Sequence, residues 1–70
     1  MELDTKIGDK VKLTNIHYGR KYDQEKVKEH LIENNLYTVL NIDIDDWLSQ
    51  VSFKEIGKGV FFNTVHFSNI

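Results

Sequence analysis

Short segments with β-type patterning recur along this chain and constrain its fold more than any other feature. In residues 10–14 apolar and polar side chains alternate, which places Val11 and Leu13 on one face of a strand. Glycine-containing turns such as Gly57-Lys58-Gly59 suit hairpins between strands. The chain is therefore predicted to be mainly β, with further short strands at residues 36–44, 48–55, 60–62 and 66–70.

One segment breaks this pattern and predicts a short helix over residues 23–33. Asp23 is a residue type that commonly caps a helix N-terminus. Val27 and Leu31 stand four residues apart, with Ile32 beside Leu31, so one stripe of the helix can face a core.

The predicted strand at residues 36–44 changes its pattern along its length. Tyr37 and Val39 share one parity, whereas Ile42 and Ile44 share the other. Such a change indicates a β-bulge or a strong bend, which a small barrel needs at its corners. Five short strands also have edges to protect, and rolling the sheet into a barrel protects them.

Length and composition indicate a single domain spanning residues 1–70. Hydrophobic residues make up 40% of the chain, which is enough for a compact core. There is no cysteine, so neither a disulfide nor a zinc thiolate can stabilise the fold. No apolar run approaches the ~20 residues of a membrane span, and the charged N-terminal residues do not form a signal peptide. A cytoplasmic protein without membrane contact is expected.

The charge of the chain is not that of a general nucleic-acid binder. Its net charge is −2, whereas such binders are strongly basic. Seven of the nine Lys and Arg residues nevertheless lie within residues 1–35, so a local basic patch remains an alternative.

Several short motifs lie in the predicted strands: Ile7-Gly8-Asp9-Lys10-Val11, Leu36-Tyr37-Thr38-Val39-Leu40, Val51 with Phe53, Gly59-Val60-Phe61-Phe62-Asn63, and Phe67. Together they resemble the small SH3-like barrel proteins encoded by phages and prophages of Gram-positive bacteria, over residues 7–14 and 36–70. The resemblance implies a five-stranded SH3-like barrel and a phage origin, and it offers no catalytic residues. Residues 15–35 depart from it, because a longer loop and the helix are inserted between the first and second strands.

No constellation of residues indicates catalysis, a metal or a cofactor. His17, His30 and His66 stand 13 and 36 residues apart, which matches no compact metal-ligand motif, so we interpret them as surface or half-buried residues. The serines lack the context of a nucleophile elbow, and a barrel of this size has little room for a deep pocket. A non-enzymatic protein is expected.

Four residues of the insert are the strongest candidates for binding. Tyr18, Arg20, Lys21 and Tyr22 combine two aromatic rings with two cations beside a glycine. Stacking plus charge holds single-stranded nucleic acid, and Tyr and Arg equally anchor protein interfaces. The simpler alternative is that one ring packs over the barrel end while the cations are solvated.

A second candidate segment is Asp45, Asp46 and Trp47, a predicted loop between strands. The acidic pair is interpreted as a solvated turn, since a calcium loop would need further ligands that the sequence lacks. Trp47 either covers one end of the core or is an exposed anchor.

These observations predict a small binding module that contacts a protein. If the phage resemblance holds, the partner is a host protein in the host cytoplasm, and binding inhibits a host enzyme or defence system. The alternative is nucleic-acid binding through residues 18–22 together with Lys10, Lys12, Lys26 and Lys28.

Overall fold

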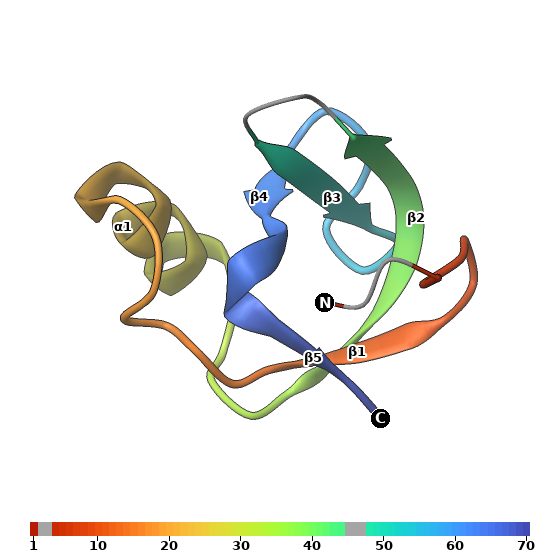
Figure 1. Ribbon diagram of the computed structural model, residues 1–70, viewed down its shortest axis with the longest axis horizontal. Helices are drawn as coiled ribbons and strands as arrows, with labels where there is room; N and C mark the ends of the chain where they lie inside the picture. The colour runs from red at the N-terminus through yellow and green to blue at the C-terminus, as the bar shows by residue number, and fades with distance from the viewer. Residues whose placement is uncertain (2–3, 45–47) are drawn as a thin grey trace.

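The computed structural model describes residues 1, 4–44 and 48–70. Within them the chain forms one five-stranded antiparallel sheet, one α-helix and one 3₁₀ turn (Figure 1). In chain order the elements are β1 (Lys10–Leu13), α1 (Lys21–His30), β2 (Leu36–Ile44), β3 (Ser49–Phe53), β4 (Phe62–Asn63), η1 (Thr64–His66) and β5 (Phe67–Asn69). The prediction of a mainly β chain with a short helix between its first two strands is confirmed.

Strand β2 is shared by two halves of a bent sheet whose strand order is β4-β3-β2-β1-β5. Its first residues pair with β1, and the stretch from Val39 to Ile44 pairs with β3. The register shifts between Val39 and Asn41, which confirms the irregularity predicted from the change of parity. The shift bends β2, visible as the long curved ribbon in Figure 1, so that one strand serves both halves.

The sheet is open among the described residues, so the closed barrel that the sequence predicted is not what the strands form. Its two edge strands, β4 and β5, are consecutive in the chain and are joined directly by η1. The amide of Phe67 donates to the carbonyl of Thr64, and the Asn63 side chain accepts from the amide of Val65. Because these groups complete a 3₁₀ turn, the two edges meet at η1 without forming a ladder with each other.

Four aromatic rings form the centre of the core. The ring of Phe53 contacts those of Tyr37, Phe62 and Phe67, with centroid separations of 5.4, 5.8 and 4.8 Å. Val11 and Leu13 of β1 are fully buried, as their alternation predicted. The buried apolar residues together are Val11, Leu13, Val27, Leu31, Tyr37, Val39, Val51, Phe53, Phe62 and Phe67.

Several element boundaries differ from those expected from the sequence. The strand predicted over residues 48–55 ends at Phe53, because the carbonyl of Phe53 accepts the amides of Ile56 and Gly57 and starts a turn. The strand predicted at residues 60–62 covers residues 62–63 instead. The last strand begins at Phe67, because His66 belongs to η1, and ends at Asn69.

The helix begins two residues earlier and ends three residues earlier than predicted. Arg20 is its N-cap residue and Asp23 lies in the first turn, so the predicted role of Asp23 as N-cap is wrong. At the other end Leu31 is extended, with φ −126°, and is buried, whereas Ile32 is 65% exposed and does not join the core. Extended backbone directs successive side chains to opposite sides, which explains this contrast.

His66 is fully buried, which contradicts the expectation that all three histidines lie at or near the surface. Its Nδ1 lies 2.8 Å from the carbonyl oxygen of Asn15. A carbonyl only accepts hydrogen bonds, so Nδ1 carries the proton and donates it. His66 therefore fastens the start of the inserted segment to η1, while His17 and His30 are exposed.

Candidate binding surface on the inserted segment

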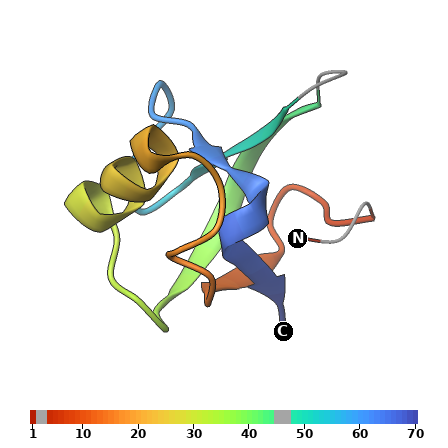
Figure 2. The same ribbon diagram turned by 60° about the vertical axis from the view of Figure 1, so that its left-hand side comes forward.

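Residues 15–35, called the inserted segment below, contain a loop, helix α1 and a short return to β2. The helix stands to one side of the strands and contacts β4 (Figures 1 and 2). Val27 and Leu31 contribute to the common core, and the hydroxyl of Tyr37 accepts the amide of Ile32 at 2.8 Å. The inserted segment is therefore packed against the sheet.

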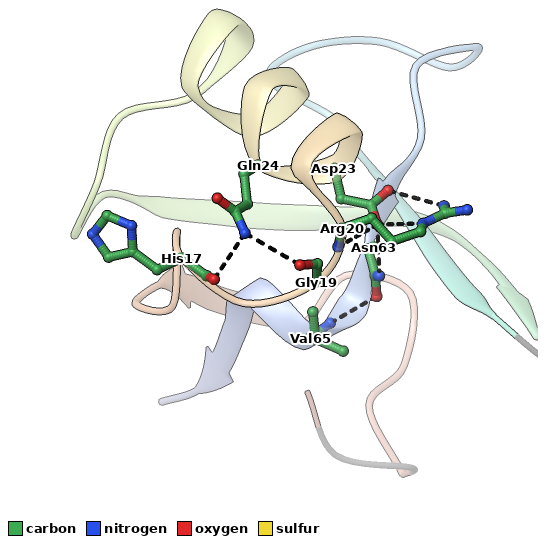
Figure 3. A network of polar contacts seen from close by, with 7 residues as sticks. All are labelled: His17, Gly19, Arg20, Asp23, Gln24, Asn63 and Val65. Carbon is green, nitrogen blue, oxygen red and sulfur yellow. Dashed lines mark hydrogen bonds and ion pairs between the residues drawn. The ribbon is translucent and has the colours of Figure 1, made fainter.

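Arg20 and Asp23 form the centre of a polar network at the start of α1 (Figure 3). The guanidinium donates from Nε to Oδ2 at 2.9 Å and from Nη2 to Oδ1 at 3.2 Å. The backbone amide of Arg20 also donates to Oδ2, at 3.2 Å. This carboxylate satisfies an amide at the helix N-terminus and lies where the helix dipole favours negative charge.

Asp23 also joins the inserted segment to the sheet. Its Oδ2 accepts from Nδ2 of Asn63 in β4 at 3.2 Å, a contact between residues 40 positions apart. The other end of the same amide, Oδ1 of Asn63, accepts the amide of Val65 in η1 at 3.1 Å. One side chain of β4 thus links the helix start to the turn between the two sheet edges.

The surroundings of Asp23 hold the pKa of its carboxyl below the usual range. The hydrogen bond from Arg20 is the largest cause, burial opposes it, and the hydrogen bond from Asn63 adds to the lowering. The side chain is only 6% exposed. A buried carboxylate that accepts four hydrogen bonds is well suited to fix the position of the helix.

Gln24 closes the loop that precedes the helix. Its Nε2 donates to the carbonyl of His17 at 2.9 Å and to the carbonyl of Gly19 at 3.2 Å (Figure 3). Two adjacent residues of α1 therefore have separate roles. Asp23 holds the helix to the sheet, and Gln24 holds the loop to the helix.

Gly19 has a left-handed backbone just before the N-cap residue of α1, and we expect Gly19→Ala to lower the free energy of unfolding by about 1–2 kcal/mol. Its φ of +76° disfavours any side chain. An added Cβ would lie 3.4 Å from each of Asn63 Nδ2, Asp23 Oδ2 and Val65 Cγ2. Urea unfolding measures the loss.

The matched control for this substitution is Gly8→Ala. Gly8 also has a positive φ, +94°, but no atom lies within 4 Å of the position of its added Cβ. Both variants carry backbone strain, and only the first meets the network. Equal losses in the two variants would show that the neighbours of Gly19 do not matter.

Both tyrosines predicted as binding residues point outward. Tyr18 is 60% exposed in the loop and Tyr22 is 67% exposed on the helix. Lys21, the first residue of α1, is exposed as well. The ammonium of Lys26 lies 6.0 Å from the centroid of the Tyr22 ring. The structure therefore brings Tyr18, Lys21 and Tyr22 to the surface of one anchored segment.

Arg20 is both exposed and held in place. Its side chain is 66% exposed, as expected for a solvated cation, while its Nε and Nη2 donate hydrogen bonds to Asp23. Arg20 therefore contributes to the architecture of the segment.

The second predicted segment, Asp45, Asp46 and Trp47, lies outside the described residues. Asn63 and Gln24 were not among the site residues predicted from the sequence. The i,i+3 spacing of Arg20 and Asp23 was a local signal for the capping contact, whereas no local pattern connects Asp23 with a residue 40 positions away.

No group of three His, Asp or Glu side chains lies close enough together in residues 1, 4–44 and 48–70 to hold a metal ion. In that part of the chain, no helix has the length and apolar character needed to cross a bilayer.

Comparison with known families places the chain among phage proteins. The model of the family described as bacteriophage T4 protein Y07B matches residues 10–70, from the first residue of β1 to the end of the chain. The chain belongs to this family. The match contains every helix and strand described above, the inserted segment included, and it confirms the phage part of the resemblance noted in the sequence. No curated protein and no solved structure gave a match.

Proposed function

We propose that this chain is a non-enzymatic binding module that contacts a protein of the bacterial host through its inserted segment. The observation that carries the proposal is the presentation of Tyr18 and Tyr22. Both rings are mostly exposed, on a segment that hydrogen bonds fix to the sheet. Ordered, exposed aromatic side chains suit an interface, because little conformational entropy is lost when a partner covers them.

Membership in a phage family supports a partner from the infected cell. Following the sequence resemblance, we propose a Gram-positive host, action in its cytoplasm, and inhibition of a host enzyme or defence system as the consequence of binding. We also propose that the fold is of the SH3-like type, with η1 joining the two edges. The shared strand β2 and the direct β4–η1–β5 connection support this assignment.

Nucleic-acid binding is less well supported. The charge of Arg20 is already paired with Asp23, and Lys26 lies over two aromatic rings. Lys10 and Lys12 lie on the exposed face of β1, on a different element from the helix lysines. A nucleic-acid partner would show an affinity that falls steeply as salt rises.

The test is affinity capture from a host lysate with the wild-type protein and with Tyr18→Ser/Tyr22→Ser. We expect the wild type to retain a specific host protein, and the double variant to lose at least about tenfold in affinity for it, because exposed tyrosines at an interface centre contribute most of the binding energy. The affinity is then measured by calorimetry with the purified partner.

The control is Ile7→Ser, which removes an equally exposed apolar side chain outside the inserted segment. Arg20→Ala is unsuitable as a probe of charge, because it would break the capping contacts, so Lys21→Ala replaces it. Equal binding by the tyrosine variant and the Ile7 variant would refute the proposed surface. Retention of nucleic acid alone, released by salt and weakened by Lys21→Ala, would replace the protein partner with a nucleic-acid one.

A further inference from the structure

A shallow groove runs along the outward face of α1, beside Tyr22. It measures about 220 Å³ and is lined by Tyr22, Glu25, Lys26, Glu29 and His30. These positions follow the i, i+3, i+4, i+7 spacing that puts residues on one face of a helix. The opposite face of the helix carries Val27 and is buried against the core. The groove is therefore the surface that the anchored helix offers to solvent.

The size of this groove fits one side chain of a partner. Pockets for small molecules are usually ~300–1,000 Å³ and largely enclosed. A groove formed by side chains of a single helix meets neither condition. A protruding side chain from a protein surface needs no enclosure, because its own backbone covers it.

The charge of the groove favours a cation. Glu25 and Glu29 are one helical turn apart, and in the described part of the chain neither carboxylate forms a salt bridge. Lys26 is the opposing charge, but its ammonium lies 5.7 Å from the centroid of the Phe62 ring and 6.0 Å from that of Tyr22. Because the Lys26 ammonium lies over these two rings, the carboxylates of Glu25 and Glu29 remain available to a ligand.

We propose that this groove receives an arginine side chain of the partner protein. A guanidinium pairs with carboxylates through its planar fork and stacks on an aromatic face, and Glu25, Glu29 and Tyr22 supply both kinds of contact side by side. The inference rests on the proposed function and gives it a specific form, since it names the residue type that the host protein must present.

The first test uses a defined probe rather than the partner. The peptide acetyl-Gly-Arg-Gly-amide is titrated into ¹⁵N-labelled protein and followed by NMR, with the Gln and Glu peptides as comparisons. We expect the arginine peptide alone to shift the amide signals of residues 22–30, with an affinity in the millimolar range. Glu25→Gln/Glu29→Gln should weaken this binding about threefold to tenfold, because two exposed ion pairs are lost.

The control is Glu33→Gln, which removes an exposed carboxylate outside the groove and should leave the affinity unchanged. Lys26→Met is expected to change the affinity for the arginine peptide in the opposite direction. Methionine keeps an apolar stem over the rings and removes the competing charge, so the arginine peptide should bind more tightly. Weaker binding of the arginine peptide to Lys26→Met would mean that Lys26 does not compete with it and would overturn the proposal. Preferential binding of the glutamate peptide would mean an anionic ligand and would overturn it as well.

The second test separates this inference from the proposed function. Once a partner is captured, its affinity is compared for Glu25→Gln/Glu29→Gln, Glu33→Gln and Tyr18→Ser/Tyr22→Ser. If Glu25→Gln/Glu29→Gln and Tyr18→Ser/Tyr22→Ser both lose affinity for the partner while Glu33→Gln keeps it, the result supports both the proposed function and the arginine site. Full binding by Glu25→Gln/Glu29→Gln with loss in the tyrosine variant retains the binding surface and refutes the arginine. Full binding by all three refutes both.

Discussion

Phe53→Ala is expected to leave most of the protein unfolded at 25 °C. Phe53 is fully buried and its ring contacts three other aromatic rings, from β2, β4 and β5. Truncation of a buried phenylalanine costs about 3–5 kcal/mol. A chain of 70 residues has roughly 3.5–10 kcal/mol of stability in total, at about 0.05–0.15 kcal/mol per residue. The loss therefore equals the whole stability at the low end of this range, where a domain this small is expected to lie.

Urea unfolding followed by circular dichroism measures this effect, together with Phe53→Leu and Ile32→Ala. Phe53→Leu keeps most of the apolar volume and should remain folded with a lower midpoint. Ile32→Ala removes a side chain that is mostly exposed and should change stability by less than about 0.5 kcal/mol. A Phe53→Ala variant as stable as Ile32→Ala would contradict the placement of this ring at the centre of the core.

The strands were predictable because their signals are local. Alternation in residues 10–13 fixes which face of β1 is buried, and the parity change near Val39 locates the irregularity in β2. Both patterns follow from the two-residue period of a strand and need no knowledge of distant residues. At residues 57–59 both glycines do have a positive φ, but they lie within a connection that runs from Phe53 to Phe62, which is longer than the tight hairpin turn predicted.

Local patterns did not predict that the sheet stays open. The argument from unprotected edges predicts that the edges are covered, but not by which element. Here β4 contacts α1, and the turn η1 connects β4 directly to β5. Both outcomes depend on residues 64–66 forming a turn between the two edge strands.

In the candidate site too, local features were predictable from the sequence and long-range contacts were not. The exposure of Tyr18 and Tyr22 agrees with the sequence expectation, because a polar loop and the outer face of a helix are exposed in most folds. The roles of Asp23 and His66 were missed, because each depends on a partner far away in the chain, Asn63 for one and Asn15 for the other. Long-range polar contacts have no sequence period that would reveal them.

Asp23→Asn is expected to lower the free energy of unfolding at pH 7 by about 2 kcal/mol, within the ~1.5–3 kcal/mol typical of a hydrogen bond to a charged group. The variant is nearly isosteric, so it removes the charge that Arg20 and Asn63 both contact without leaving a cavity. Glu33→Gln removes an exposed carboxylate from the same segment and should change stability by less than about 0.5 kcal/mol. Urea unfolding of the three proteins at pH 7 gives the comparison.

The pH dependence of this difference identifies the ionised carboxylate as its cause. The hydrogen bond from Arg20 lowers the pKa of Asp23 in the folded protein, so folding favours the ionised form. Its contribution is fully present above the unfolded-state pKa of about 3.9 and is lost as the pH falls through the lower folded-state pKa. The stability gap between wild type and Asp23→Asn should therefore be constant from pH 7 down to about 5 and narrow below about 4. A gap that stays constant down to pH 3 would show that shape, and not charge, makes Asp23 important, and the anchoring of Tyr22 would then depend on Asn63 and Gln24 instead.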